Sequence, residues 1–148
     1  MTDVVDFAPE HKFELVRLWR ASFEEAVGIV DPHPLEEQGR YFDEAVLPKN
    51  RVVVVLEEGT VVAFLAHSRD AIAQLYVRLD RQGLGLGTML LDRAKRESGG
   101  RLRLFTFLRN VKARRFYERR GFREVRRGFE PEWKLEDVEF EWVRSTEG

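Results

Sequence analysis

Cysteine is absent from this chain of 148 residues, which excludes disulfide bonds, thiolate metal sites and a cysteine nucleophile together. Long apolar runs are also missing: the longest, residues 52–56 and 61–66, fall far short of the roughly 20 residues of a membrane-spanning helix. The first six residues have neither the basic start nor the apolar stretch of an export signal. We therefore expect a soluble, cytoplasmic protein with no metal and no membrane partner, although a chain without cysteine also suits export.

Internal repeats, low-complexity tracts and linkers are missing as well. The length matches one ordinary domain and is too short for two typical cores. Hydrophobic residues make up 43% of the chain and charged residues 34%, so the chain is apolar enough to fold around a core. We expect one domain that covers residues 1–148.

The net charge of −1 hides a strongly basic middle segment. Residues 78–127 carry 16 Lys or Arg against 5 Asp or Glu, whereas the segments before and after carry net charges of −7 and −5. A basic block suggests an anionic partner, either a phosphate-bearing cofactor or a nucleic acid, and acidic flanks favour a cationic one. Composition alone does not choose between these partners.

The spacing of apolar residues predicts an alternation of helices and strands. We expect helices at residues 9–23 and 34–48, a third from residue 86 to the glycine pair 99–100, and a fourth from Asn110 to Gly121. We expect strands at residues 51–56, 61–67, 71–77, 102–108, 122–127 and 138–144. The first two strands form a hairpin across the Gly-containing turn 57–60, and the third lies beside the second because few residues separate them. The order ααβββαβαββ indicates an α+β or mixed α/β domain around a single sheet, with a loop at residues 128–137.

A glycine-rich turn at residues 82–87, with the sequence Gln-Gly-Leu-Gly-Leu-Gly, connects the third strand to its helix. In such a turn the unpaired backbone N–H groups at the helix start can bind phosphate oxygens, and glycine lets the anion approach closely. A tight turn that binds nothing would use the same residues. No Lys follows Gly87, which disfavours a triphosphate-binding loop, and the turn lies too late in the chain for a dinucleotide-binding fold.

A second motif begins at Asn110 and ends at Phe122, with the pattern Asn-x-x-Ala-x-x-Phe-Tyr-x-x-x-Gly-Phe. This pattern resembles the C-terminal motif of the GNAT superfamily of acyl-CoA-dependent N-acyltransferases. The turn Gln82-x-x-Gly85-x-Gly87 resembles the pyrophosphate-binding motif of the same family. The two motifs occur in the family order, and the predicted elements match the family along nearly the whole chain.

The resemblance implies a GNAT-type fold, in which helices flank a central mixed, mostly antiparallel sheet. It also implies acetyl transfer from acetyl-CoA to a primary amine by direct attack in a ternary complex, which agrees with the absence of cysteine. The residues expected to bind acetyl-CoA are Tyr76, Val77, Gln82, Gly83, Leu84, Gly85, Leu86, Gly87, Thr88, Asn110, Lys112 and Arg114.

Some of these residues have a more specific expected role. A backbone N–H at the bulged end of the central strand, around Tyr76 and Val77, would stabilise the oxyanion that forms at the thioester carbonyl. Two further basic residues, Arg81 and Arg115, lie with Lys112 and Arg114 near the motifs that would hold the phosphates of CoA.

Asn110 and Tyr117 each have a structural and a functional interpretation. Asn110 is suited to cap the helix that it begins, and by resemblance its amide contacts the pantetheine arm. By the same resemblance, the Tyr117 hydroxyl donates a proton to the leaving thiolate of CoA. Tyr117 could also be a buried ring whose hydroxyl is satisfied by the protein.

The general base stays open. Many family members carry Glu on the central strand, where this chain has Gln74, which does not accept a proton. His67 has a pKa naturally suited to the task, although a single His on a strand often has a structural role. The alternatives are Asp70, Glu24, Glu25 and His33, a relay of ordered waters, or desolvation of the amine.

The acceptor pocket is expected, by resemblance, at the segment between the first two helices. Trp19, Ser22, Phe23 and His33 would line it, and the acidic flanks would attract a cationic amine. Trp133 and Trp142 are expected in the core or in an interface. The sequence does not choose between a small amine and a protein amine, and exposed aromatic residues would favour a homodimer.

Two other functions compete with an acetyltransferase. A non-catalytic CoA-binding module of the same fold is favoured by Gln74, which occupies the position on the central strand where many family members carry Glu. Nucleic-acid binding through the basic block is disfavoured because no stacking-aromatic motif accompanies the charge, so we expect no nucleic-acid partner.

Overall fold

The computed structural model describes residues 2–145. Its strands are β1 (Thr2–Asp6), β2 (Arg51–Glu57), β3 (Thr60–His67), β4 (Ile72–Val77), β5 (Arg101–Phe107), β6 (Arg123–Glu130) and β7 (Leu135–Val143). Its α-helices are α1 (Lys12–Val27), α2 (Leu35–Tyr41), α3 (Leu86–Glu97) and α4 (Val111–Glu118). A π-turn and a 3₁₀ turn extend α2 to Lys49, and shorter 3₁₀ turns precede α1 and follow β4. None of the helices in this part of the chain is long and apolar enough to span a membrane.

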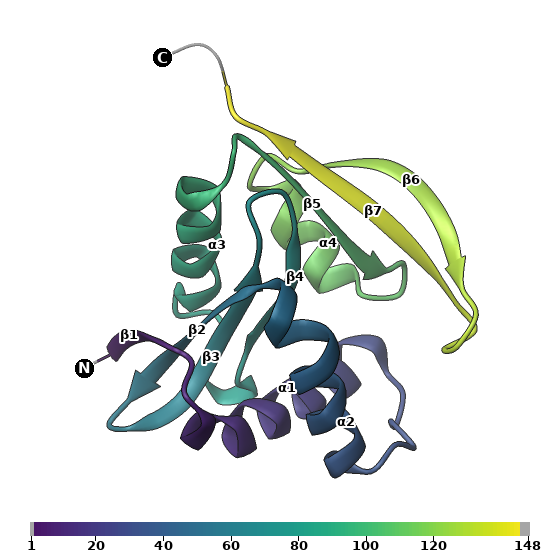
Figure 1. Cartoon of the computed structure of the whole chain (residues 1–148). Coiled ribbons are helices and arrows are strands. Elements are labelled where there is room, and N and C mark those ends of the chain that lie inside the picture. The colour runs from purple at the N-terminus through teal and green to yellow at the C-terminus, as the bar shows by residue number, and fades with distance from the viewer. Residues whose placement is uncertain (1, 146–148) are drawn as a thin grey trace.

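The strands form two antiparallel sheets, in the orders β1-β2-β3-β4 and β5-β7-β6 (Figure 1). Within the described part of the chain, one parallel bridge, Ala71 to Arg103, joins the two sheets at the beginning of β4 and β5. The Arg103 amide also donates a hydrogen bond to the Asp70 carbonyl at 3.0 Å. Because β4 and β5 are joined only at their beginnings, their carboxyl ends diverge and leave a gap between the sheets.

The fold class predicted from the sequence is confirmed, with three differences in detail. The strands divide into two sheets instead of one. Strand β1 was not predicted, because its short and mostly polar sequence has little apolar periodicity; it pairs with the edge of β2, where Val4 faces Val55. The predicted loop 128–137 is mostly strand, since Gly128 pairs with Asp137 and only residues 131–134 form the turn.

The first sheet is buried on both faces, which explains the uninterrupted valine run of β2. Val53 and Val55 belong to a core cluster that includes Leu90 of α3 and Phe140 of β7. Val52 and Val54 belong to a second cluster, formed with helix α1 and the segment after α2. Alternate residues of one strand therefore support two cores, and α1 and α3 lie on opposite faces of the sheet.

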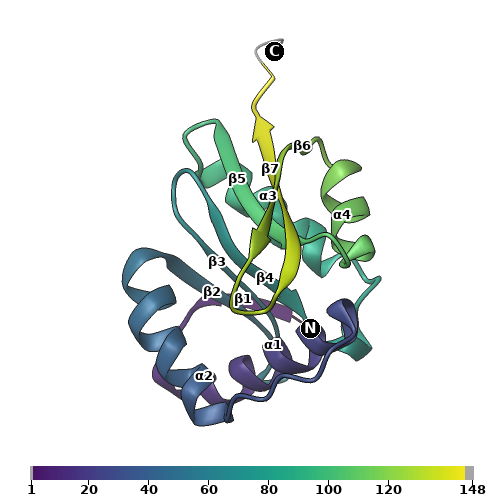
Figure 2. The ribbon, with the colours of Figure 1, turned by 90° about the vertical axis from the view of Figure 1, so that its right-hand side faces the viewer.

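The second sheet brings the β6–β7 turn close to the chain between α1 and α2 (Figure 2). The Trp133 ring in this turn lies 5.2 Å from the Phe23 ring of α1 and 5.5 Å from the His33 ring, centroid to centroid. Residues from the first and last thirds of the chain thus surround one space beside β4.

Candidate active site

A cavity of about 440 Å³ lies at the carboxyl end of β4, where the two sheets diverge. The end of β4, the glycine-rich turn and helix α4 form most of its wall, and Ser22 and Ala26 of α1 complete it. Of the residues expected to bind acetyl-CoA, ten line this cavity: Tyr76, Val77, Gln82, Gly83, Gly85, Leu86, Gly87, Thr88, Asn110 and Lys112. The structure therefore brings most of the predicted residues into one place.

The backbone of Val77 is turned toward the cavity. The next residue, Arg78, donates its amide to the Val62 carbonyl of β3 at 2.8 Å, so the antiparallel alternation directs the peptide groups of Val77 away from β3. The Val77 carbonyl accepts hydrogen bonds from Ser22 Oγ at 2.8 Å and from Gln82 Nε2 at 3.0 Å. The Val77 N–H lies on the same side of the strand and faces the gap.

The bulge expected near Tyr76 and Val77 is at the other end of β4. Pairing with β3 is regular from Val77 to Gln74, and the register shifts only between Ala66 and His67, opposite residues 72–74. The Val77 N–H is therefore exposed by the divergence of the sheets and needs no bulge to face the cavity.

The start of α3 presents unpaired backbone donors to the cavity. Gly85 precedes the helix in the left-handed region, with φ +90°, and no side chain caps the helix. The first helical hydrogen bond runs from the Met89 amide to the Gly85 carbonyl, at 3.0 Å. The amides of residues 86–88 thus have no partner within the helix and can bind an anion.

The glycines of this turn keep the donors accessible. At Gly83 (φ +78°) and Gly85, an added Cβ would meet no other atom within 4 Å, so the space beside the turn is open. A Cβ at Gly87 would lie only 3.3 Å from the Phe116 ring of α4, so glycine lets the two helices approach closely. The open space and the free amides can accommodate an anion.

Basic side chains surround the glycine turn, though not all of those predicted. The Lys112 ammonium donates a hydrogen bond to Gln82 Oε1. Two residues that the sequence analysis missed, Arg119 and Arg120, also line the cavity. The Arg120 guanidinium donates to Thr88 Oγ1 at 2.8 and 3.0 Å and lies 3.9 Å from the centre of the Phe116 ring.

Three predicted residues take other positions. The Arg114 side chain turns to the Leu108 carbonyl, at 3.1 Å, and lies outside the cavity. Leu84 is 69% exposed and also lies outside it. Arg81 lines the cavity, but its guanidinium forms two hydrogen bonds with the Glu57 carboxylate at 2.8 and 2.9 Å and holds the pKa of Glu57 below its usual value. Most of the Arg81 charge is thereby compensated.

Asn110 and Tyr117 come from the α4 motif and both face the cavity. Asn110 caps α4, since its Oδ1 accepts the Ala113 amide at 3.1 Å, and its Nδ2 has no partner among the described residues. Tyr117 is 7% exposed, with its ring packed between Phe116 and Phe122. Burial raises the pKa of the Tyr117 hydroxyl above its ordinary value, so the hydroxyl stays protonated at neutral pH.

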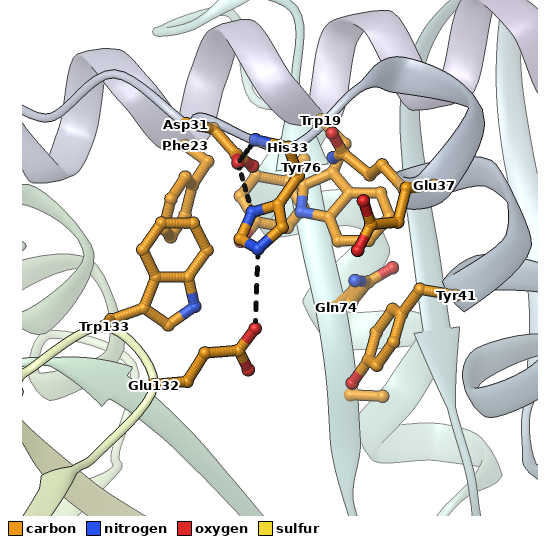
Figure 3. Close-up of a pocket in the computed structure, with 12 residues that line it drawn as sticks. Trp19, Phe23, Asp31, His33, Glu37, Tyr41, Gln74, Tyr76, Glu132 and Trp133 are labelled. Carbon is orange, nitrogen blue, oxygen red and sulfur yellow. Dashed lines mark hydrogen bonds and ion pairs between the residues drawn. The ribbon is translucent and has the colours of Figure 1, made fainter.

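A second cavity, of about 280 Å³, adjoins the first along Tyr76, which lines both (Figure 3). Trp19, Phe23 and His33 line it, as predicted for the acceptor pocket, whereas Ser22 faces the first cavity. Trp133, expected in the core or an interface, is a wall of this second cavity. No Lys or Arg is among the described residues that line it.

His33 lies at the centre of this cavity and forms a dyad with Asp31 (Figure 3). Its Nδ1 is 2.7 Å from Asp31 Oδ1, and its Nε2 lies 3.7 Å from a carboxylate oxygen of Glu132. The hydrogen bond to Asp31 raises the pKa of His33, and the negative charges of Glu37 and Glu132 act in the same direction. On the side away from the cavity, Arg20 donates to the His33 carbonyl and lies 3.5 Å from Asp31 Oδ2.

His67, the predicted base, lies away from both cavities. It pairs with Ile72, at the beginning of β4, and lines neither cavity. The ring is 3% exposed, and its Nε2 lies 3.2 Å from Glu97 at the end of α3. His67 is therefore a buried structural residue, and of the alternatives, His33 is the one whose ring reaches a cavity.

Gln74 lies on β4 at the wall of the second cavity. Its Oε1 is buried and has no hydrogen-bond partner among the described residues. A buried carbonyl oxygen without a donor is costly.

Comparison with known proteins supports the family suggested by the sequence. The family model described as the acetyltransferase (GNAT) domain matches residues 48–124, about half of the chain. A comparison with curated sequences gave no match.

Solved structures share the fold along nearly the whole chain. YjaB from Escherichia coli superposes with a TM-score of 0.80 at 20% identity and covers 98% of this chain and 99% of its own. An acetyltransferase from Thermus thermophilus has a TM-score of 0.76 at 24% identity, with 97% of each chain covered. The PaiA N-acetyltransferase from Thermoplasma acidophilum, solved in complex with coenzyme A, has a TM-score of 0.76 at 16% identity and covers 97% of this chain and 99% of its own.

Proposed function

Because this chain belongs to the GNAT acetyltransferase family, we propose that it transfers an acetyl group from acetyl-CoA to a primary amine. The observation that carries the proposal is the meeting of two unlike cavities at Tyr76. One offers backbone amides and basic side chains to an anion, and the other offers carboxylates and aromatic rings to a cation. An acyl donor that carries phosphates and an acceptor amine need such a pair of sites.

Acetyl-CoA fits the first cavity through its charge. The diphosphate would accept hydrogen bonds from the amides of residues 86–88, with Lys112, Arg119 and Arg120 nearby. The pantetheine arm would follow the gap between β4 and α4, where Asn110 Nδ2 is free to donate. The fold shared with the coenzyme A complex of PaiA supports this choice of donor.

The reaction would be a direct transfer. The neutral amine nitrogen attacks the thioester carbonyl, the C–N bond forms, and the negative charge on the carbonyl oxygen is stabilised by the Val77 N–H. The C–S bond then breaks, the leaving sulfur takes the proton of the Tyr117 hydroxyl, and the proton that the nitrogen loses as the amide forms returns to Tyr117 through water. Burial keeps this hydroxyl protonated, so the proton is available at neutral pH.

His33 would take the proton of the amine, directly or through one water. Asp31 accepts the Nδ1 hydrogen and orients the ring, so Nε2 of the neutral ring faces the cavity as a proton acceptor. A free amine with a pKa of about 10.4 is almost fully protonated at pH 7, so a base that removes this proton accelerates attack. In this proposal the general base is His33, and His67, which the sequence suggested, has no part in the reaction.

An acceptor screen that follows CoA release tests the proposal. Acetyl-CoA is supplied with small amines, aminoglycosides and peptides that carry a free lysine or N-terminus. Release of CoA in proportion to acetylated amine is expected for at least one class. Tight binding of acetyl-CoA with no turnover on any amine would contradict the proposal.

A non-catalytic CoA-binding module of the same fold is the second candidate. It is favoured by Gln74, since an amide on β4 does not accept a proton. It predicts acetyl-CoA binding without thioester consumption, so the same screen separates the two functions.

A further inference from the structure

Not every carboxylate of the second cavity is paired with a positively charged group or a hydrogen-bond donor. Asp31 is engaged by His33 and Arg20. Among residues 2–145, Glu132 has one polar contact, 3.7 Å from His33 Nε2, and its side chain is 67% exposed. The Glu37 side chain has no ion pair or hydrogen bond with any described residue. Glu37 and Glu132 come from α2 and from the β6–β7 turn, and Figure 3 shows both carboxylates directed into the space around His33.

Aromatic rings form two walls of the same space. On one side, the centroid of the Trp19 ring lies 6.3 Å from that of Tyr41 and 6.4 Å from that of Tyr76. On the other side, Phe23 and Trp133 are 5.2 Å apart. Such walls bind methylene groups by dispersion and attract cations to their faces.

These observations point to an acceptor with a second positive charge. The amine that reacts must lose its proton before attack, so it does not compensate a carboxylate at that moment. A second ammonium group keeps its charge throughout and could remain paired with Glu37 and Glu132. A monoamine would leave both carboxylates uncompensated.

We propose that the acceptor is a small aliphatic diamine, whose reacting amine lies near His33 Nε2 while its second, charged amine is held by Glu37 and Glu132. This inference rests on the proposed acetyl transfer. The aromatic walls enclose the methylene chain, and the volume of about 280 Å³ is small for a ligand site, which favours a short free amine over a peptide.

The test compares 1,4-diaminobutane with butylamine, which has the same chain and lacks one amine. CoA release is followed at saturating acetyl-CoA with each acceptor and with a lysine-containing peptide. The diamine is expected to have a kcat/KM about tenfold above that of butylamine, as two partly exposed charge pairs would give. In Glu37→Gln, KM for the diamine should rise about threefold and KM for butylamine should not. Both acceptors are compared at a pH above the titration of His33, because Glu37 also raises the pKa of His33.

Glu36→Gln is the matched control, since Glu36 precedes Glu37 on α2, is exposed and does not line the cavity. Glu36→Gln should leave KM unchanged for both acceptors. Diamine binding is measured separately, in the presence of CoA, by quenching of tryptophan fluorescence, because Trp19 and Trp133 line the cavity.

The outcomes separate the two proposals. Equal kcat/KM for the two amines, or a clear preference for the peptide, overturns the diamine assignment and leaves acetyl transfer intact. Diamine binding that depends on Glu37 but gives no CoA release supports the cation site and contradicts acetyl transfer. Absence of both binding and turnover overturns both.

Discussion

Replacement of Tyr117 by Phe tests the proton-donor role most selectively, because it removes one hydroxyl and keeps the ring. The ring packs 5.2 Å from Phe116 and 5.4 Å from Phe122, contacts that phenylalanine retains. The hydroxyl has no hydrogen-bond partner among the described residues, so its loss should change the free energy of unfolding by less than about 1 kcal/mol. The substitution therefore acts on chemistry with little effect on folding.

The expected effect on turnover is a decrease of about tenfold or more. General acid catalysis typically contributes about 10²- to 10⁴-fold, and a thiolate, whose conjugate acid has a pKa near 8.5, needs less help than an alkoxide. Steady-state CoA release gives kcat, and titration calorimetry gives the affinity for acetyl-CoA, which should change less than threefold. A large loss of affinity with unchanged kcat would refute the reasoning and make Tyr117 a packing residue.

Three further predictions concern the donor site, the base and the core. Gly85→Val should raise the Kd for acetyl-CoA at least about tenfold, because a side chain enters the open space of the proposed anion site. Gly59→Val is the control, since Gly59 in the β2–β3 turn has a similar φ of +80° and therefore similar backbone strain; it should leave this Kd unchanged. In the wild type, kcat/KM for the amine should rise with pH around a midpoint above the usual histidine pKa, because the neighbouring carboxylates stabilise the protonated ring of His33. His33→Gln should abolish this rise. A pH–rate profile identical to that of the wild type would exclude His33 as base. Phe140→Ala should cost about 3–5 kcal/mol in urea unfolding, since this ring is fully buried, and a loss below about 1 kcal/mol would contradict the core described above.

Local patterns in the sequence predicted most of the elements. The valine run of β2, the glycine-rich turn and the Asn110 motif act over short distances, so their spacing alone indicates a strand, a tight turn before a helix and a helix cap. Strand β1 escaped prediction because its order depends on the partner edge of β2, which lies about fifty residues away in the chain.

The errors at the site have a common origin in tertiary contacts. Arg114 and Arg120 are both arginines on or next to α4, and only the folded chain shows that one turns to the Leu108 carbonyl and the other to Thr88. Trp133 reaches the second cavity because the β6–β7 hairpin is longer than its sequence suggests. The direction of β3 places His67 away from both cavities, which a strand pattern alone does not reveal.

A crystal structure of the complex with CoA would show where the diphosphate and the thiol bind. Diphosphate oxygens are expected to accept hydrogen bonds from the amides of residues 86–88, with the thiol close to the Tyr117 hydroxyl. A diphosphate bound at any other surface, or a thiol remote from Tyr117, would contradict the assignment of both cavities.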